Sequence, residues 1–180
     1  MVERELQWFH LIISTYGSWL HGDARGFRTR HHREHIDGDY KNPPPEGTHA
    51  ERENNSRQSL KRAPVIFIPE QRALVGIALR DKLQSLGGFV LCFSVAGQHV
   101  HILVKLPAGL ARSWMGNAKL HAWFELRDKC GWIGQMWGKR GKELSVRDRR
   151  HQLNVYRYIL DHAKDGAWVW TWMDEKTRNK

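Results

Sequence analysis

The sequence has few cysteines, and their positions exclude two kinds of protein. Its 180 residues include only Cys92 and Cys130, which lie far apart and form no Cys-x-x-Cys pair. A small secreted domain held together by disulfides needs more cysteines, and a thiolate zinc site needs closely spaced ones. We therefore expect neither. Two separate thiols are compatible with a reducing cytoplasm, which is the location that we expect.

Long apolar segments are also missing. No stretch approaches the ~20 apolar residues that a helix needs to cross a bilayer. The amino-terminal residues MVEREL contain no basic region followed by an apolar run, so they do not resemble a signal peptide. No internal repeat or heptad is visible, which excludes a solenoid or a coiled coil. We expect no membrane partner.

Acidic residues are scarce relative to basic ones. Lys and Arg number 29 against 19 Asp and Glu, which gives a net charge of +10. Such a charge favours a polyanionic partner, and nucleic acid is the leading candidate. Charge that serves only solubility remains the alternative at this point.

Apolar residues nearly vanish between about 22 and 64, while 41% of the whole chain is hydrophobic and 9 residues are Trp. We interpret residues 1–180 as one domain with a long polar insertion at about 22–64. The insertion contains His31, His32 and His35. A second metal site is conceivable there, but a solvated basic loop is the preferred interpretation.

Hydrophobic periodicity and turn residues predict the order of the elements outside the insertion. Strands and helices are expected as follows: a strand at 6–15, a helix from 69 to the glycines at 87–88, a hairpin of strands 89–95 and 99–106, a helix at 109–129, a strand or short hairpin within 135–146, a helix at 147–164, and an aromatic tail that adds a strand or packs on the sheet. This order predicts an α+β, ferredoxin-like βαββαβ antiparallel sheet with an extra C-terminal helix. The first two helices should cover one face of the sheet.

The strand 99–106 carries two candidate metal ligands. Side chains alternate along a strand, so His99 and His101 point to one face while Val100 and Ile102 point to the other. Two neighbouring imidazoles can share one metal ion. Two half-exposed histidines without a metal are the alternative, and a third ligand is needed to decide between them.

The last predicted helix supplies that ligand and a candidate nucleophile. Tyr158 and His162 are four residues apart and therefore share a helical face with Asp161. Tyr156 instead belongs to the face of Leu160 and its apolar neighbours, as a core-packing tyrosine would. Tyr158 is accordingly the preferred nucleophile and Tyr156 the fallback.

Three segments carry a resemblance to a known family. They are GQHVHILVKLP at 97–107, QMWGKRG at 135–141 and YRYILDHAKDGAW at 156–168. Together they resemble the single-tyrosine HUH transposases, in particular the insertion-sequence-200-type and REP-associated tyrosine transposases. The likeness covers 6–15 and about 65–168 but not the insertion. Many relatives have Tyr-Ile-x-x-Asn-Pro where this chain has Tyr158-Ile-Leu-Asp-His162-Ala. His162 thus retains a possible metal ligand at the asparagine position, and alanine replaces the proline.

The resemblance implies a reaction and its components. His99, His101 and His162 would bind a divalent metal, Mg²⁺ or Mn²⁺, and Tyr158 would cleave single-stranded DNA through a 5′-phosphotyrosine that a free 3′-OH can later attack. The expected partner is single-stranded DNA, in particular hairpin-forming DNA, and the protein would act as a monomer or a homodimer. Transposition or a domesticated derivative of it would be the function.

Residues just before the tyrosine are candidates for DNA binding. Individually each is a surface charge or a core aromatic, but together they favour a groove for a single strand. They are Lys139, Arg140, Lys142, Arg147, Arg149, Arg150 and the base-stacking candidate Trp137. The segment 16–23 either lines the same groove or forms a packed turn, and the two interpretations stay equal.

Two other functions compete with this one. A catalytically silent nucleic-acid-binding protein on the same fold is the main alternative. RNA-ligase-like phosphoesterases also place histidines on strands but need two His-x-Ser/Thr motifs, whereas this chain has a single His-x-His.

Overall fold

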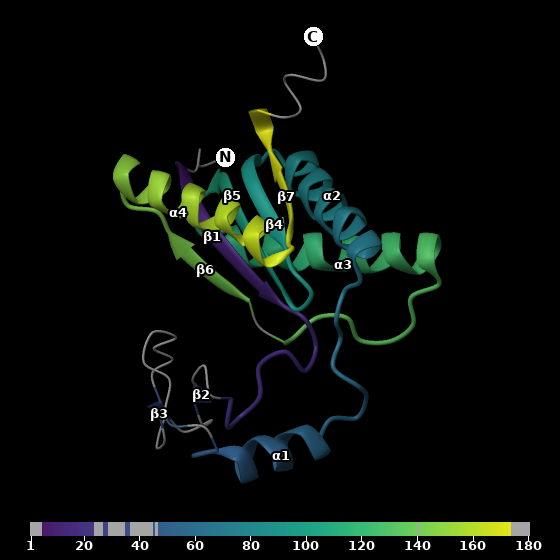
Figure 1. Cartoon of the computed structure of the whole chain (residues 1–180). Coiled ribbons are helices and arrows are strands. Elements are labelled where there is room, and N and C mark those ends of the chain that lie inside the picture. Colours follow the sequence, from purple (N-terminus) through teal and green to yellow (C-terminus); the bar gives the residue numbers. More distant parts are fainter. Residues whose placement is uncertain are drawn as a thin grey trace.

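The computed structural model describes residues 5–23, 27–28, 35–36, 45, 47–139 and 141–173, with the backbone alone at 27–28 and 35–36. Its centre is a five-stranded antiparallel sheet in the order β6-β1-β5-β4-β7 (Figure 1). The strands are β1 (Leu6–Ser14), β4 (Phe89–Val95), β5 (His99–Pro107), β6 (Lys142–Ser145) and β7 (Trp168–Thr171). The α+β class and the βαββαβ order predicted from the sequence are confirmed.

The helices outside the sheet are α1 (Ala50–Gln58), α2 (Pro69–Ser85), α3 (Ala111–Cys130) and α4 (Arg149–Asp161), and a 3₁₀ turn, η1 (His162–Asp165), continues α4. Two short strands, β2 (Phe27–Arg28) and β3 (His35–Ile36), pair with each other. None of the helices in the described ranges is long and apolar enough to cross a membrane.

Helices α2 and α3 cover one face of the sheet, as predicted. The alternating residues Phe9, Leu11 and Ile13 of β1 point to this face, and Leu79 of α2 and Ala118 of α3 are buried in the same apolar cluster. Burial of these side chains is the main source of stability for the domain. This cluster leaves the opposite face of the sheet to α4.

Helix α4 packs on the opposite face through a smaller apolar cluster. Val155 and Ile159 contact Cys92 of β4 and Leu103 of β5, and Figure 1 shows α4 lying across these strands. A bulge in β4 between Val90 and Cys92 interrupts the alternation of side chains there. The start of α4 is fixed because Asp148 accepts a hydrogen bond of 2.7 Å from the backbone N–H of His151.

The aromatic tail forms strand β7 and also packs on the sheet. Trp170 stacks on Phe93 with ring centroids 5.3 Å apart. Gly76 of α2 permits this arrangement, because a Cβ atom at that position would lie 2.3 Å from the ring of Phe93. Strand β7 therefore contributes to the core.

Replacement of Phe93 by alanine should destabilise the protein strongly. The ring is 1% exposed and lies between Gly76 and the tryptophans of β7, so its removal leaves a cavity. We expect a decrease of about 3–5 kcal/mol in the free energy of unfolding, measured by urea denaturation. Phe124→Ala is the matched control, because that ring is 39% exposed. Equal decreases for the two variants would contradict the assignment of Phe93 to the core.

Some predicted boundaries differ from the observed ones. Only four residues of the stretch 135–146 form a strand, β6, although Trp137 also makes an isolated bridge to Thr15. The last predicted helix, 147–164, is divided into α4 and the 3₁₀ turn η1. Gly166 follows η1 with a φ of 75°, a conformation that suits glycine and turns the chain into β7.

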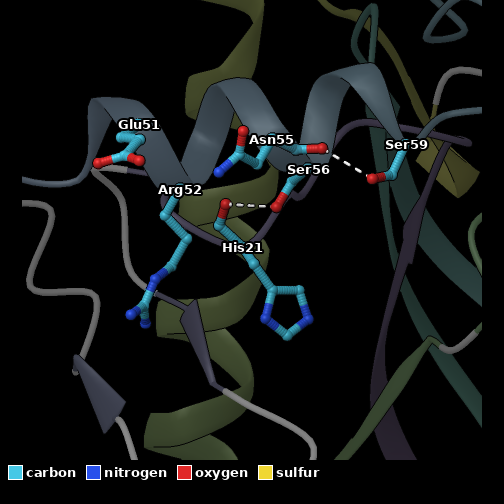
Figure 2. A pocket seen from close by; sticks show the side chains of 6 residues that line it. All are labelled: His21, Glu51, Arg52, Asn55, Ser56 and Ser59. Carbon is cyan, nitrogen blue, oxygen red and sulfur yellow. Dashed lines mark hydrogen bonds between the residues drawn. The ribbon is translucent and has the colours of Figure 1, made fainter.

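The polar insertion contains a helix that the sequence did not predict. Helix α1 has no buried residue, and polar contacts hold it instead. Ser56 donates a hydrogen bond of 2.8 Å to the carbonyl of His21, and Gly22 lies so close to the backbone of Glu53 that a Cβ atom would not fit. Figure 2 shows the open polar pocket beside this contact. His31 and His32 lie outside the described residues, as does the side chain of His35.

Candidate metal and tyrosine site

Strand β5 places His99 and His101 side by side on the face that α4 covers. This strand lies in the middle of the sheet, where His101 pairs with Ile12 of β1 on one side and Ser94 of β4 on the other. The two ring centroids are 5.1 Å apart. His101 is buried and His99 is half-buried, so the two imidazoles lie at the border of the core.

Helix α4 and turn η1 bring Tyr158 and His162 over the two strand histidines. The ring of His162 stacks on His101 with centroids 4.7 Å apart and also lies 5.3 Å from His99. The ring of Tyr158 is 4.8 Å from His162 and 5.2 Å from His101. Tyr158 is 47% exposed, so its ring borders the histidines while remaining open to solvent.

The three imidazoles His99, His101 and His162 could hold a metal ion. Each offers one ring nitrogen, and these nitrogens lie within 4.8 Å of one another. The Nε2 atom of His162 is buried and has no hydrogen-bond partner within the described structure. A buried imidazole nitrogen without a partner is costly unless something else satisfies it, and a metal ion would do so. The donor set therefore fits a metal centre.

Burial favours the neutral forms of His101 and His162, and a histidine that binds a metal must be neutral. Burial lowers the pKa of His101 to about 2, and the neighbouring His10, His99 and His162 depress it as well. Burial also lowers the pKa of His162, although Asp165 and Asp161 partly oppose this effect. A neutral imidazole keeps a lone pair for coordination.

His10 is a member of the site that the sequence analysis missed. It lies on β1 diagonally across from His101, and its Nε2 atom is 2.9 Å from Nδ1 of His101. Burial lowers its pKa to about 4, with smaller contributions from His151 and His162. The sequence does show a histidine within the otherwise apolar strand Leu6–Ser14, but only the pairing of β1 with β5 places it beside His101.

Tyr156 occupies a different environment from Tyr158. It is partly buried and packs against the apolar cluster beneath α4, which contains Cys92 and Leu103. The side chain of Tyr156 therefore contributes to packing, as its helical face suggested. Tyr158 is the tyrosine whose ring contacts the histidines.

Five of the basic candidates for DNA binding have exposed side chains: Lys139, Lys142, Arg147, Arg149 and Arg150. Arg140 lies outside the described residues.

Trp137 does not suit the role of a base-stacking side chain. It is 8% exposed, its ring packs on Phe67, and its indole N–H donates to the carbonyl of Lys119. The prediction is corrected, because aromatic content near basic residues does not distinguish a buried ring from an exposed one. The segment 16–23 forms a packed turn in which Ser18 is buried and donates to the carbonyl of Thr15, while Trp19 is 53% exposed.

Comparisons with known proteins give the following results. No family model matches the sequence, and no curated protein matches it in sequence. A REP-associated tyrosine transposase bound to a REP hairpin has a similar structure, with a TM-score of 0.48, 15% sequence identity, and coverage of 92% of this chain and 73% of the other. A candidate transposase from Deinococcus radiodurans R1 gives a TM-score of 0.48 and 13% identity over 89% of this chain and 94% of the other.

Proposed function

We propose that this chain is a metal-dependent DNA-strand transesterase of the single-tyrosine HUH type. The observation that supports the proposal is the convergence of Tyr158 with His99, His101 and His162 on one face of the sheet. A nucleophile beside a metal centre is an arrangement that can cleave a phosphodiester, because the ion activates the phosphate that the nucleophile attacks. The segments that resemble the HUH transposases contain these same four residues.

His99, His101 and His162 would hold the metal ion in this proposal. When bound, a divalent ion withdraws charge from the scissile phosphate and orients it. Imidazole nitrogens favour transition ions, whereas Mg²⁺ prefers oxygen ligands. We therefore propose that the three histidines bind Mn²⁺ in preference to Mg²⁺.

Tyr158 would act as the nucleophile. Its half-exposed ring leaves space for a phosphate to approach, and it contacts the rings of His101 and His162, which would hold the metal ion. Attack of the phenolic oxygen on phosphorus forms an O–P bond and releases the 3′ oxygen, while the phenol loses its proton and the 3′ oxygen gains one. The resulting 5′-phosphotyrosine retains the energy of the broken bond, so a second 3′-OH can replace the tyrosine and join two strands.

Single-stranded DNA is the proposed substrate, in the form of a strand beside a hairpin. The exposed residues Lys142, Arg147 and Arg150 precede Tyr158 in the chain and would bind phosphates. The tyrosine and all three histidines lie together within the chain, and the protein would act as a monomer or a homodimer.

The proposal predicts a covalent product that depends on metal. The purified protein is incubated with a labelled pool of single-stranded oligonucleotides that carry random sequence beside a hairpin, in Mn²⁺ or with EDTA. We expect a protein–DNA adduct that survives denaturing electrophoresis in Mn²⁺ and is absent with EDTA. DNA binding without an adduct under either condition would overturn the proposal in favour of the silent binding protein.

Removal of the basic side chains should weaken DNA binding in a salt-dependent manner. The logarithm of the DNA association constant falls linearly as the logarithm of the salt concentration rises. For the double variant Arg147→Ala/Arg150→Ala, this slope should become less negative by about 0.7 for each phosphate of a single strand that the protein no longer neutralises. Fluorescence anisotropy at several salt concentrations measures this slope. The matched control is Arg127→Ala/Lys129→Ala, which removes two exposed charges from the end of α3. Equal slopes for the two double variants would exclude Arg147 and Arg150 from the DNA interface.

A further inference from the structure

His10 and His101 form a buried pair beneath the candidate metal centre. Their side chains are 6% and 5% exposed, and Nε2 of His10 lies 2.9 Å from Nδ1 of His101. The ring centroids are 5.1 Å apart and the planes are tilted by 36°, so the rings meet through their nitrogens rather than by stacking face to face. This hydrogen bond occupies Nδ1 of His101 and leaves Nε2 as the nitrogen that can bind a metal.

The hydrogen bond can be made in two ways, and only one of them permits coordination. A neutral imidazole carries one N–H and one bare nitrogen. If His101 donates from Nδ1, its Nε2 atom is bare and can bind a metal ion. If His10 donates instead, the proton of His101 lies on Nε2, which then cannot coordinate. The role of His10 as acceptor or donor therefore decides whether His101 is a ligand.

The position of His10 suits an acceptor for Nδ1–H of His101, because its Nε2 atom lies 2.9 Å from that nitrogen. Both side chains are buried, so the two ring nitrogens have each other as partners. The backbone of β1 is fixed by its pairing with β5 over the whole strand, so the position of the ring is set by the sheet.

We propose that His10 is a positioning residue that accepts a hydrogen bond from Nδ1–H of His101 and thereby presents the bare Nε2 of His101 to the metal ion. The inference rests on the proposed function, since it assigns His10 a task toward that metal. A partner on the second ring nitrogen fixes both the tautomer and the orientation of a ligating histidine. Here the partner is a second imidazole on the neighbouring strand.

Two substitutions of His10 separate hydrogen bonding from packing. His10→Phe keeps a ring of similar size and removes the acceptor. His10→Gln offers an amide oxygen near the position of Nε2. His121→Phe is the matched control, because His121 lies on α3 and its interaction with Glu125 is remote from the site. Circular dichroism of each variant establishes that the fold is retained.

The first measurement is the tautomer of His101 in the metal-free protein, read from ¹⁵N chemical shifts and long-range couplings of the imidazole. We expect the Nδ1–H form in the wild type and in His10→Gln, and a mixture in His10→Phe. A wild-type His101 with its proton on Nε2 would overturn the proposal.

The second measurement is the affinity for Mn²⁺ by isothermal titration calorimetry. We expect His10→Phe to bind Mn²⁺ roughly 10- to 100-fold more weakly than the wild type, with His10→Gln recovering most of the affinity and His121→Phe unchanged. Unchanged binding by His10→Phe would overturn the role of His10 and leave the proposed function intact. Absence of Mn²⁺ binding by the wild type would overturn both.

Discussion

Replacement of Tyr158 by phenylalanine is expected to abolish the covalent adduct with DNA. The substitution removes the one oxygen that would attack phosphorus and leaves the ring in contact with His101 and His162. The side chain is 47% exposed, so the fold should lose no more than about 0.5 kcal/mol. Denaturing electrophoresis with labelled hairpin DNA and Mn²⁺ measures the adduct, and anisotropy measures binding, which should persist.

Tyr156→Phe is the matched control for this experiment. Tyr156 lies two residues earlier on α4 and packs toward the apolar cluster rather than the histidines. This variant should form as much adduct as the wild type. An adduct that survives in Tyr158→Phe and disappears in Tyr156→Phe would reassign the nucleophile to Tyr156.

Replacement of His162 by alanine should weaken Mn²⁺ binding by at least about a hundredfold, more than the removal of a residue that only positions a ligand. The substitution removes one of three ring nitrogens that lie within 4.8 Å of one another. His162 also has the buried Nε2 atom that lacks a partner in the described structure, so its removal should not destabilise the fold through a broken hydrogen bond. Isothermal titration calorimetry measures the affinity.

His162→Gln tests the same position more finely. An amide oxygen can still coordinate, but it favours a harder ion than an imidazole does. This variant should therefore retain metal binding with a preference displaced from Mn²⁺ toward Mg²⁺. Full Mn²⁺ affinity in His162→Ala would show that His162 is not a metal ligand.

Local periodicity was sufficient to predict which side chains of the candidate site share a face. Alternation along a strand placed His99 and His101 on one face, and a spacing of four placed Tyr158 and His162 on one side of a helix. Each inference needed one element only. The meeting of the two elements over the sheet is seen in the structure, where α2 and α3 cover one face and α4 packs on the other.

His10 could not be assigned in this way, since its role depends on the register between two strands that are about ninety residues apart in the chain. Helix α1 was missed for a different reason. It has no apolar face, so no periodicity reveals it, and its contacts with His21 and Gly22 are polar or involve the backbone. Trp137 was misjudged because burial of an aromatic ring depends on its tertiary neighbours.

The apolar cluster beneath α4 has a consequence for thiol chemistry. It contains Cys92, which is fully buried and whose pKa is raised by burial to about 12, whereas Cys130 is exposed at the end of α3. Because the thiolate is the reactive form, an alkylating reagent should modify Cys130 directly and reach Cys92 only when α4 leaves the sheet. The chain thus carries a native reporter of any movement of its tyrosine helix, read by mass spectrometry without an added label.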